Sequence, residues 1–333
     1  MAASIRDVAQ LAGVSVGTVS NVLNRPDEVA PDTVTRVNSA IEQLAYVRND
    51  AARRLRAGVS RTVGFVVLDG QNPFFNDVVR GAEDEAFRHG IALIHGNTDE
   101  DVARERMYLD LFEEQQVRGV LIAPHGDVTS QLARLRARGI PSVLIDRFSG
   151  DGRFSSVSVD SLAGGRMAAE HLIGTGRRRI AVVGGPYDLR QMNDRLAGAR
   201  IAVDDSDADV ELEVVATEAM TVAEGAAAGE RILARPRRER PDAVFAGNDL
   251  LALGLLQSLV VDGRSLVPDE IALIGFDDIP FAAAAAVPLT SLRQPSRVIG
   301  RTALRILLEE STDPEAIPRQ TVFQPELIVR ASA

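Results

Sequence analysis

The stretch that decides the fold lies near the N-terminus and reads Ser4-Ile-Arg-Asp7-Val-Ala-Gln-Leu-Ala-Gly13-Val-Ser15-Val-Gly-Thr-Val-Ser20-Asn-Val-Leu23. Its apolar residues recur at helical spacing, and Ser4 followed three residues later by Asp7 is the pattern of an N-terminal helix cap. Gly13 is expected to end this first helix, and Ser15 to cap a second one. The sequence therefore predicts two short helices separated by a tight turn.

The second predicted helix has an inner and an outer face. Val19, Val22 and Leu23 would face inward, which leaves residues 16–21 to present their polar members outward near the start of the helix. In helix-turn-helix proteins, the residues at this position contact base edges in the DNA major groove. Two short amphipathic helices around a glycine also occur in many helical domains, so the motif alone leaves a purely structural helix pair open.

Two later segments favour the DNA-binding interpretation. A third helix is expected to begin near Pro31, and its apolar residues can cover the first two helices; these are Val34, Val37, Ile41 and Leu44. After it, residues 49–58 form a short helix-capable piece that Asn49 can cap and Gly58 can end. This piece has almost no apolar face, so we expect it to contact something other than a protein core.

Further motifs follow in order along nearly the whole chain. They are Ala51-Ala-Arg-Arg-Leu55, Asn72-Pro-Phe-Phe75, Val143-Leu-Ile-Asp146-Arg147, Arg195-Leu-Ala-Gly198, Phe245-Ala-Gly-Asn248-Asp249, Val267-Pro-Asp269, Gly275-Phe-Asp277-Asp278 and Leu289-Thr-Ser-Leu-Arg-Gln294-Pro295. Together with residues 5–24, this series resembles the lactose and galactose repressor (LacI-type) family of bacterial transcription factors. The resemblance implies a DNA-binding head, a hinge helix and a body that binds a small effector.

Composition limits the class of protein. A chain of 333 residues with 45% hydrophobic residues can bury large cores, and the absence of cysteine excludes disulfides and thiolate metal sites. No apolar run is long enough to span a membrane and the N-terminus lacks a signal-peptide pattern, so a cytoplasmic location is expected. Residues 1–61 carry a net charge of +2 and the remainder −12. An acidic body would repel DNA and leave its binding to the head.

From Thr62 onward, short apolar runs alternate with helical patterns, which is typical of parallel sheets with crossover helices. The predicted fold class is multidomain: an all-α helix-turn-helix head and an α/β body of two doubly wound parallel-sheet lobes, of the periplasmic-binding-protein-like type I. The expected domains are a head over 1–48, a hinge helix and linker over 49–61, and a body over 62–333. The first lobe is expected over about 62–148 with a returning segment near 280–295, and the second over about 149–279 with about 296–333.

Ligands of such sheets bind beyond the carboxyl ends of the strands, and two lobes would enclose one shared cleft. The residues that follow predicted strands are therefore effector-site candidates, and the family resemblance adds Arg195 and supports Arg147, Asn248 and Asp277. The full set of candidates is Asp69, Asn72, Phe74, Phe75, His125, Arg147, Arg195, Asn248, Phe276 and Asp277. Asp249 and Asp278 have a structural interpretation as caps of the next helix or turn.

The candidate DNA contacts are Ser4, Ser15, Val16, Gly17, Thr18, Ser20, Asn21, Asn24, Arg48, Asn49, Arg53, Arg54 and Leu55. Asn21 can make the bidentate contact that favours adenine, and Val16 can touch a thymine methyl, whereas Gly17 offers no side chain. The resemblance implies that the helix carrying Leu55 folds on DNA and wedges this leucine into the central minor-groove step. Relatives usually carry a proline where this chain has Arg48, which adds a phosphate contact instead of a bend.

Other patterns are weak as evidence for chemistry. Residues 13–17 fit the G-x-S-x-G pattern of a hydrolase elbow, but a capped helix precedes them rather than a strand. Gly174-Thr-Gly176 follows a helix and lacks the third glycine of a dinucleotide loop. The four histidines are scattered without metal-ligand spacing. We therefore expect no catalytic residues, no metal and no cofactor, and the chain offers no convergent set of nucleophile, base and oxyanion donors.

These patterns together predict a homodimeric, ligand-responsive repressor that binds a pseudo-palindromic operator on double-stranded DNA. Closure of the lobes on a small carbohydrate would release the DNA, by shifting the spacing of the hinge helices. A corepressor role for the effector and a tetrameric assembly remain open. The competing class is a periplasmic-type sugar-binding protein, which shares the two-lobed body but has no DNA-binding head.

Overall fold

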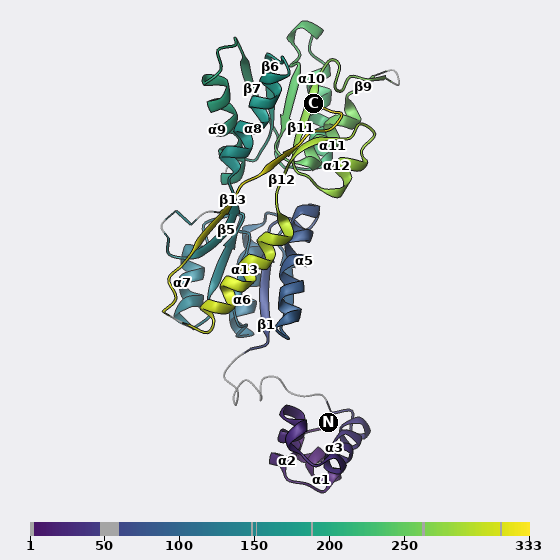
Figure 1. The fold of residues 1–333 in the computed structure, drawn as a ribbon, viewed down its shortest axis with the longest axis vertical. Helices are drawn as coiled ribbons and strands as arrows, with labels where there is room; N and C mark the ends of the chain where they lie inside the picture. The colour runs from purple at the N-terminus through teal and green to yellow at the C-terminus, as the bar shows by residue number, and fades with distance from the viewer. Residues whose placement is uncertain are drawn as a thin grey trace. The chain divides into compact units, whose positions relative to one another are not determined.

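A computed structural model describes residues 3–46, 60–147, 149–150, 152–187, 189–261, 264–313 and 315–333. The chain separates into two compact units, which we call the head (Met1–Val59) and the body (Ser60–Ala333), and each is described by itself (Figure 1). In the described residues, no helix is both long enough and apolar enough to cross a membrane. The predicted hinge helix and the DNA-contact candidates Arg48, Asn49, Arg53, Arg54 and Leu55 lie outside the described residues.

Residues 3–46 of the head form a unit of three α-helices, as the sequence predicts. Its elements are α1 (Ile5–Ala12), α2 (Val16–Asn24), the 3₁₀ helix η1 (Pro26–Glu28) and α3 (Pro31–Gln43). Ser4 and Asp7 form the predicted reciprocal cap of α1, and Gly13 ends that helix in the left-handed conformation with φ 66°. The three helices bury one small core of Val8, Ala9, Ala12, Val19, Val22, Val37 and Ala40.

The first lobe of the body is built on a six-stranded parallel sheet, sheet A, with strand order β13-β5-β4-β3-β1-β2. Its strands are β1 (Thr62–Val67), β2 (Ala92–Asn97), β3 (Val120–Ile122), β4 (Ser142–Ile145), β5 (Ser155–Val159) and β13 (Gln320–Phe323). Helices α5 (Pro73–Arg88) and α13 (Ser296–Glu310) pack on one face, and α6 (Val102–Glu114) and α7 (Thr129–Ala137) on the other. The parallel strands direct all their carboxyl ends toward one edge.

The second lobe repeats this plan on sheet B, with strand order β14-β12-β11-β8-β6-β7 and only β14 antiparallel. Its strands are β6 (Arg179–Gly184), β7 (Glu211–Ala216), β8 (Ala243–Ala246), β11 (Ala272–Asp277), β12 (Thr290–Arg293) and β14 (Glu326–Ile328). Helices α8 (Ser161–Gly174) and α9 (Arg190–Asp204) cover one face, and α10 (Val222–Leu233) and α11 (Asp249–Ser258) the other. The short elements are η2 (Arg237–Glu239), the β9 (Val260–Val261) and β10 (Arg264–Ser265) hairpin, and α12 (Pro280–Ala284).

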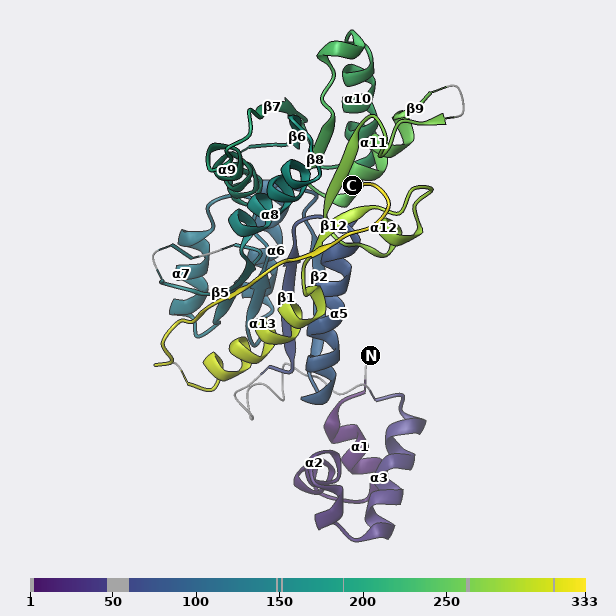
Figure 2. The same cartoon turned by 45° about the horizontal axis from the view of Figure 1, so that its top comes forward.

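The returning segments differ from those expected from the sequence. β12 pairs with β11 and so belongs to the second lobe, whereas α13 packs against α5 and β13 pairs with β5, which places both in the first lobe (Figures 1 and 2). The predicted assignment of 280–295 and 296–333 is therefore wrong for these elements. The contact of α13 with α5 is close, because a Cβ at Gly81 would lie 2.1 Å from the carbonyl oxygen of Arg297. The chain thus crosses between the lobes three times.

Candidate functional site

The first candidate site is the surface formed by the N-terminal half of α2, which is the part of the head that can read DNA. Ser15 caps α2 by accepting a hydrogen bond from the Thr18 backbone N–H at 3.0 Å. Ser15, Gly17 and Asn21 are exposed, whereas the side chains of Val16, Thr18 and Ser20 are half-buried. A Cβ at Gly17 would meet only the Ser15 Oγ, at 3.5 Å, so packing does not require glycine there. Four of these six residues thus present only small or hydroxylated side chains.

Ser4 and Asn24, at the two ends of the motif, are engaged within the head. The Ser4 backbone N–H and the Ser4 Oγ each donate to Asp7 Oδ2 at 2.8 Å, and these two hydrogen bonds lower the pKa of Asp7. Asn24 Nδ2 donates to the Ser20 carbonyl oxygen at 2.8 Å at the end of α2. Both side chains therefore hold the helix ends in place, and a contact to DNA would use their remaining polar atoms.

The second candidate site is a polar cavity between the two lobes of the body. Its lining residues are Leu68, Asp69, Asn72, Phe74, Phe75, Glu100, Asp146, Gln191, Arg195, Met220, Asn248 and Asp277. They lie at or just beyond the carboxyl ends of strands in both sheets, or on the helices that come next. The prediction of a shared cleft at this edge is in agreement with this geometry, and seven of the ten candidate residues line the cavity.

Asp277 is the centre of the hydrogen bonding across the cleft. Asn72 Nδ2, from the first lobe, donates to its Oδ2 at 3.0 Å, and Gln294 Nε2, from a crossing segment, donates to its Oδ1 at 2.7 Å. Asn72 also caps α5 by accepting from the Phe74 N–H at 2.9 Å. Asp277 has a φ of 113°, a sparsely populated backbone conformation that the surrounding contacts must hold. One carboxylate therefore links both lobes.

Arg195 is the buried cation of the site. Its side chain is 3% exposed, and Nη1 donates to the Gly247 carbonyl oxygen at 2.6 Å. The guanidinium carbon lies 3.7 Å from the centre of the Phe276 ring, a cation–π contact. Its Nε has no hydrogen-bond partner among the described residues, so the guanidinium keeps a donor available.

The carboxylates of the cleft are poorly solvated. Burial raises the pKa of Asp146 to about 7, which Arg195 opposes and Asp277 reinforces. Burial also raises the pKa of Asp277, against the effects of Arg195, Asn72 and Gln294, and burial likewise raises that of Asp69. Gln191 Nε2, on α9, donates to Asp146 Oδ2 at 3.3 Å, a second hydrogen bond between the lobes. Each carboxylate would gain from a ligand that donates hydrogen bonds.

The lobes nearly fill the cavity between them. Its volume is about 20 Å³, room for roughly one water molecule. Phe74 and Phe75 form one wall, with ring centroids 5.0 Å apart and an edge-to-face angle of 69°. Asn248 contributes from the second lobe, but its amide is engaged, since Nδ2 donates to the Met220 carbonyl oxygen at 3.1 Å. A ligand as large as a sugar therefore needs the lobes or these side chains to move apart.

Three predicted residues lie away from this cavity. Phe276 is fully buried in the core of the second lobe beneath Arg195, so it supports the guanidinium and does not form a wall of the cavity. Arg147 lines a neighbouring hollow with Arg190, and one of its Nη atoms donates to the Gly126 carbonyl oxygen. The His125 backbone N–H donates to the buried Glu105. Asp146, whose φ is 55°, turns the chain between β4 and Arg147.

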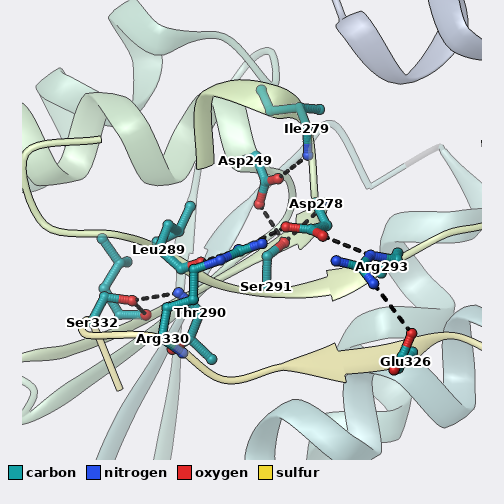
Figure 3. Close-up of polar contacts among 11 residues, drawn as sticks. Asp249, Asp278, Ile279, Leu289, Thr290, Ser291, Arg293, Glu326, Arg330 and Ser332 are labelled. Carbon is teal, nitrogen blue, oxygen red and sulfur yellow. Dashed lines mark hydrogen bonds and ion pairs between the residues drawn. The ribbon is translucent and has the colours of Figure 1, made fainter. Parts of the chain in front are cut away.

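Asp249 and Asp278 have structural roles (Figure 3), but neither is the predicted cap of the next helix, because Asn248 caps α11 and no side chain caps α12. Asp249 is fully buried and accepts from Ser291 Oγ at 2.6 Å and from the Ile279 N–H at 2.8 Å, and burial raises its pKa. Asp278 pairs with Arg293 and Arg330 at 2.8 and 2.7 Å. These contacts tie β11 to β12 and to the C-terminal strand beside it. They hold the turn that presents Asp277.

Gln191 and Gln294 are absent from the effector-site residues predicted from the sequence, although Gln294 belongs to one of the family motifs. Gln294 follows β12, a strand that the sequence patterns did not predict, so its place at a carboxyl end went unseen. Gln191 lies in the first turn of α9, beyond β6, and the sequence patterns predict no site residue in that turn. Both residues could have been identified by examining the polar residues beyond the carboxyl end of every strand in both lobes.

Comparisons with known proteins identify the family of the chain. A family model of bacterial regulatory proteins, lacI family, matches residues 4–49, and one of the periplasmic binding protein-like domain matches residues 169–333. The HTH-type transcriptional repressor PurR of Aliivibrio fischeri (strain ATCC 700601 / ES114) is 35% identical over 99% of this chain and 98% of its own length. The chain belongs to the LacI family.

Two further LacI-family comparisons cover almost the whole chain. The ribose operon repressor of Escherichia coli (strain K12) is 33% identical over 99% of this chain and 100% of its own length. A solved structure described as a transcriptional regulator CelR-cellobiose complex has 32% identity and a TM-score of 0.71, and covers 99% of this chain and 100% of its own. This LacI-family chain is therefore a DNA-binding transcriptional regulator that responds to a small molecule, and not an enzyme.

Proposed function

We propose that this LacI-family chain is a homodimeric repressor of a pseudo-palindromic operator and that a small, neutral, sugar-like effector bound between its lobes releases it from DNA. The single observation that supports the effector class is the charge of the cavity lining. Among the described residues that line it, one guanidinium, that of Arg195, meets four carboxyl groups: Asp69, Glu100, Asp146 and Asp277. Such a site offers far more hydrogen-bond acceptors than cationic donors.

A polyhydroxylated ligand fits this lining best. Each sugar hydroxyl can donate to a carboxylate, and an apolar sugar face can stack on Phe74 or Phe75. A phosphorylated ligand would meet several like charges, which disfavours it. The names of two relatives mention ribose and cellobiose, which is consistent with a sugar, whereas a purine offers fewer donor groups to these carboxyl oxygens.

For DNA binding, we propose that residues 16–21 enter the major groove. The exposed Asn21 would read adenine by a bidentate contact, and the partly exposed Val16 would touch a thymine methyl. Because Gly17 contributes no side chain, much of the specificity would come from the spacing of two heads and from Leu55 in the central step. The contacts of Arg53 and Arg54 with phosphates belong to the same hypothesis.

The dimer would use the β2 edge of the first lobe. β2 is the end strand of sheet A, and large apolar side chains on it and on the adjoining α6 are exposed: Ile94 at 54%, Met107 at 53% and Leu111 at 41%. Exposed apolar side chains beside an unpaired strand edge favour association with a second copy. Sedimentation of the Met107→Glu/Leu111→Glu variant as a monomer, where the parent chain sediments as a dimer, would support this surface.

The function is tested by capturing operators from genomic fragments with the full-length protein and then titrating the captured complexes with candidate effectors. We expect pentoses, hexoses or disaccharides to release the DNA. Purine bases and sugar phosphates are the comparison ligands, and we expect them not to release it. Release by purines alone would overturn the sugar assignment. A sugar that tightens DNA binding would make the effector a corepressor, and an absence of any captured fragment would overturn the operator hypothesis.

A further inference from the structure

A second cavity lies in the first lobe, at the end of sheet A opposite the interlobe cleft. It is bordered by the start of β4, the residue before β5 and the C-terminal ends of α7 and α13. Because β4 and β5 are parallel, their amino ends lie at the far edge of the sheet from their carboxyl ends. The cavity has a volume of about 90 Å³, several times the roughly 10–15 Å³ that one water molecule needs.

The most informative residue of this cavity is Ser142, the first residue of β4. It is 4% exposed and lines the cavity, and its Oγ has no hydrogen-bond partner among the described residues. Buried polar atoms are nearly always hydrogen-bonded in native proteins, because an unpaired one costs about 1–3 kcal/mol. An unpaired buried hydroxyl that faces an open cavity therefore points to a bound molecule as its partner.

The cavity lining carries both signs of charge. Arg136 and Arg153 both contribute to it, and Arg136 Nη1 donates to the Arg153 carbonyl oxygen at 2.9 Å, which brings the two arginines together. Glu310, at the end of α13, supplies a carboxylate that accepts a hydrogen bond from Ser155 Oγ. Burial raises the pKa of Glu310, and the nearby Arg136 opposes this only in part. A cationic group in the cavity would relieve that cost.

The rest of the lining is mostly apolar, from Pro141, Phe154, Ala316 and Pro318, but it also includes Ser311 and a second carboxylate, that of Asp313. We propose that this cavity is a second small-molecule site for a zwitterion with a short apolar side chain, such as a free aliphatic amino acid. Its carboxylate binds Arg136 and Arg153, its ammonium binds Glu310, and Ser142 gains a hydrogen bond from the ligand. The side chain packs on Phe154 and the prolines.

This proposal stands apart from the operator and sugar hypothesis, since it concerns another end of the lobe and direct binding of another chemical class. The test is calorimetric titration of the full-length protein with the aliphatic amino acids, up to about 10 mM, tenfold above a Kd of about 1 mM. Short-chain carboxylates and amines without the second charge serve as matched ligands. We expect binding by the zwitterion that is at least about tenfold tighter than binding by either single-charge analogue.

Variants locate the site. Arg136→Gln/Arg153→Gln and Glu310→Gln should each weaken amino-acid binding by about tenfold or more, since each removes a charged hydrogen-bond partner. Ser142→Ala should weaken it less and is the mildest probe of the cavity. Arg238→Gln, an arginine whose side chain is 86% exposed in the second lobe, is the matched control and should leave binding unchanged. Thermal unfolding of each variant checks that it folds.

The contradicting outcomes are specific. No measurable heat with any amino acid would overturn the site, and equal binding of the single-charge carboxylates would overturn the zwitterion assignment. Binding that Asp277→Asn abolishes and the Arg136→Gln/Arg153→Gln variant leaves intact would belong to the interlobe cleft instead.

Discussion

The DNA-reading face of the head and the interlobe cleft of the body carry their polar groups in opposite environments. On the head, Ser15, Gly17 and Asn21 face solvent, and the helix beneath them is held by an apolar core that they do not enter. In the cleft, Asn72, Arg195 and Asp277 are at least 93% buried and hydrogen-bond across or within the lobes. Stability and binding are therefore separable in the head and coupled in the cleft.

The largest expected effect is the loss of Arg195. Arg195→Ala leaves the carboxylates of Asp146 and Asp277 without their buried cation, so we expect it to lower the free energy of unfolding by about 3–5 kcal/mol. The Arg195→Ala variant should also fail to release DNA when the effector is added. Urea unfolding of the purified chain measures the change.

Arg200→Ala is the matched control, because Arg200 is exposed on the same helix and its loss should change stability by less than about 0.5 kcal/mol. Equal stabilities of the Arg195 and Arg200 variants would contradict the coupling of stability and binding in the cleft.

Leu55→Ala should act on DNA binding alone. If the leucine is an apolar wedge, losing its buried area should cost about 1–3 kcal/mol or more of operator affinity, while the free energy of unfolding stays the same. Fluorescence anisotropy with a labelled operator measures the affinity. Unchanged operator binding would show that Leu55 does not act as a wedge.

Asn21→Ala should lower operator affinity by about 1–3 kcal/mol through the loss of one base contact, and it should relax the preference at a single base pair. Because Asn21 is exposed, stability should stay within about 0.5 kcal/mol of the parent chain. Gel shifts on operators with each base at that position give the result. The separation of stability from binding in the head fails if this variant unfolds more easily.

The smallest expected effect concerns pH. The folded chain raises the pKa of Asp146 from 3.8 to about 7, so between these values the folded state binds more protons than the unfolded state. Stability should therefore fall as pH rises through this window and level off above about pH 7. Asp146→Asn removes the titrating group and should flatten that fall. Because Asp146 is only half-buried and solvent screens part of its charge, we expect the change to be less than about 1 kcal/mol. Parallel slopes for both chains, in unfolding experiments from pH 4 to 8, would exclude this role.

The head could be predicted closely from the sequence because its signals are local. Ser4, Gly13, Ser15 and Pro31 each mark a helix end through contacts with residues at most a few positions away, and α1, α2 and α3 begin or end beside them. Helical periodicity then also fixes which side chains of α2 are exposed. In the head, one pattern determines both the fold and the candidate site.

The cleft could be predicted only in part. The position of Asp69, Asn72 and Asp277 near the carboxyl ends of strands was enough to predict that they lie together. Periodicity does not tell which way the chain turns after a strand, and this is why Arg147 was misplaced. Phe276 was misplaced because β11 runs to Asp277, so Phe276 lies inside the strand and not after it. The short strand β12, with only four residues, went unrecognised, so the crossing segments were assigned to the wrong lobes and Gln294 was missed.

The most direct test is the affinity of the full-length chain for its captured operator, measured with and without a neutral sugar, for the parent chain and for Asp277→Asn. We expect the sugar to weaken operator binding by the parent chain at least about tenfold, a typical allosteric coupling. Asp277→Asn should bind the operator as tightly and respond to the sugar about tenfold less. An unchanged response of Asp277→Asn, or no response of the parent chain to any sugar, would contradict the claim that the acidic cleft controls the head.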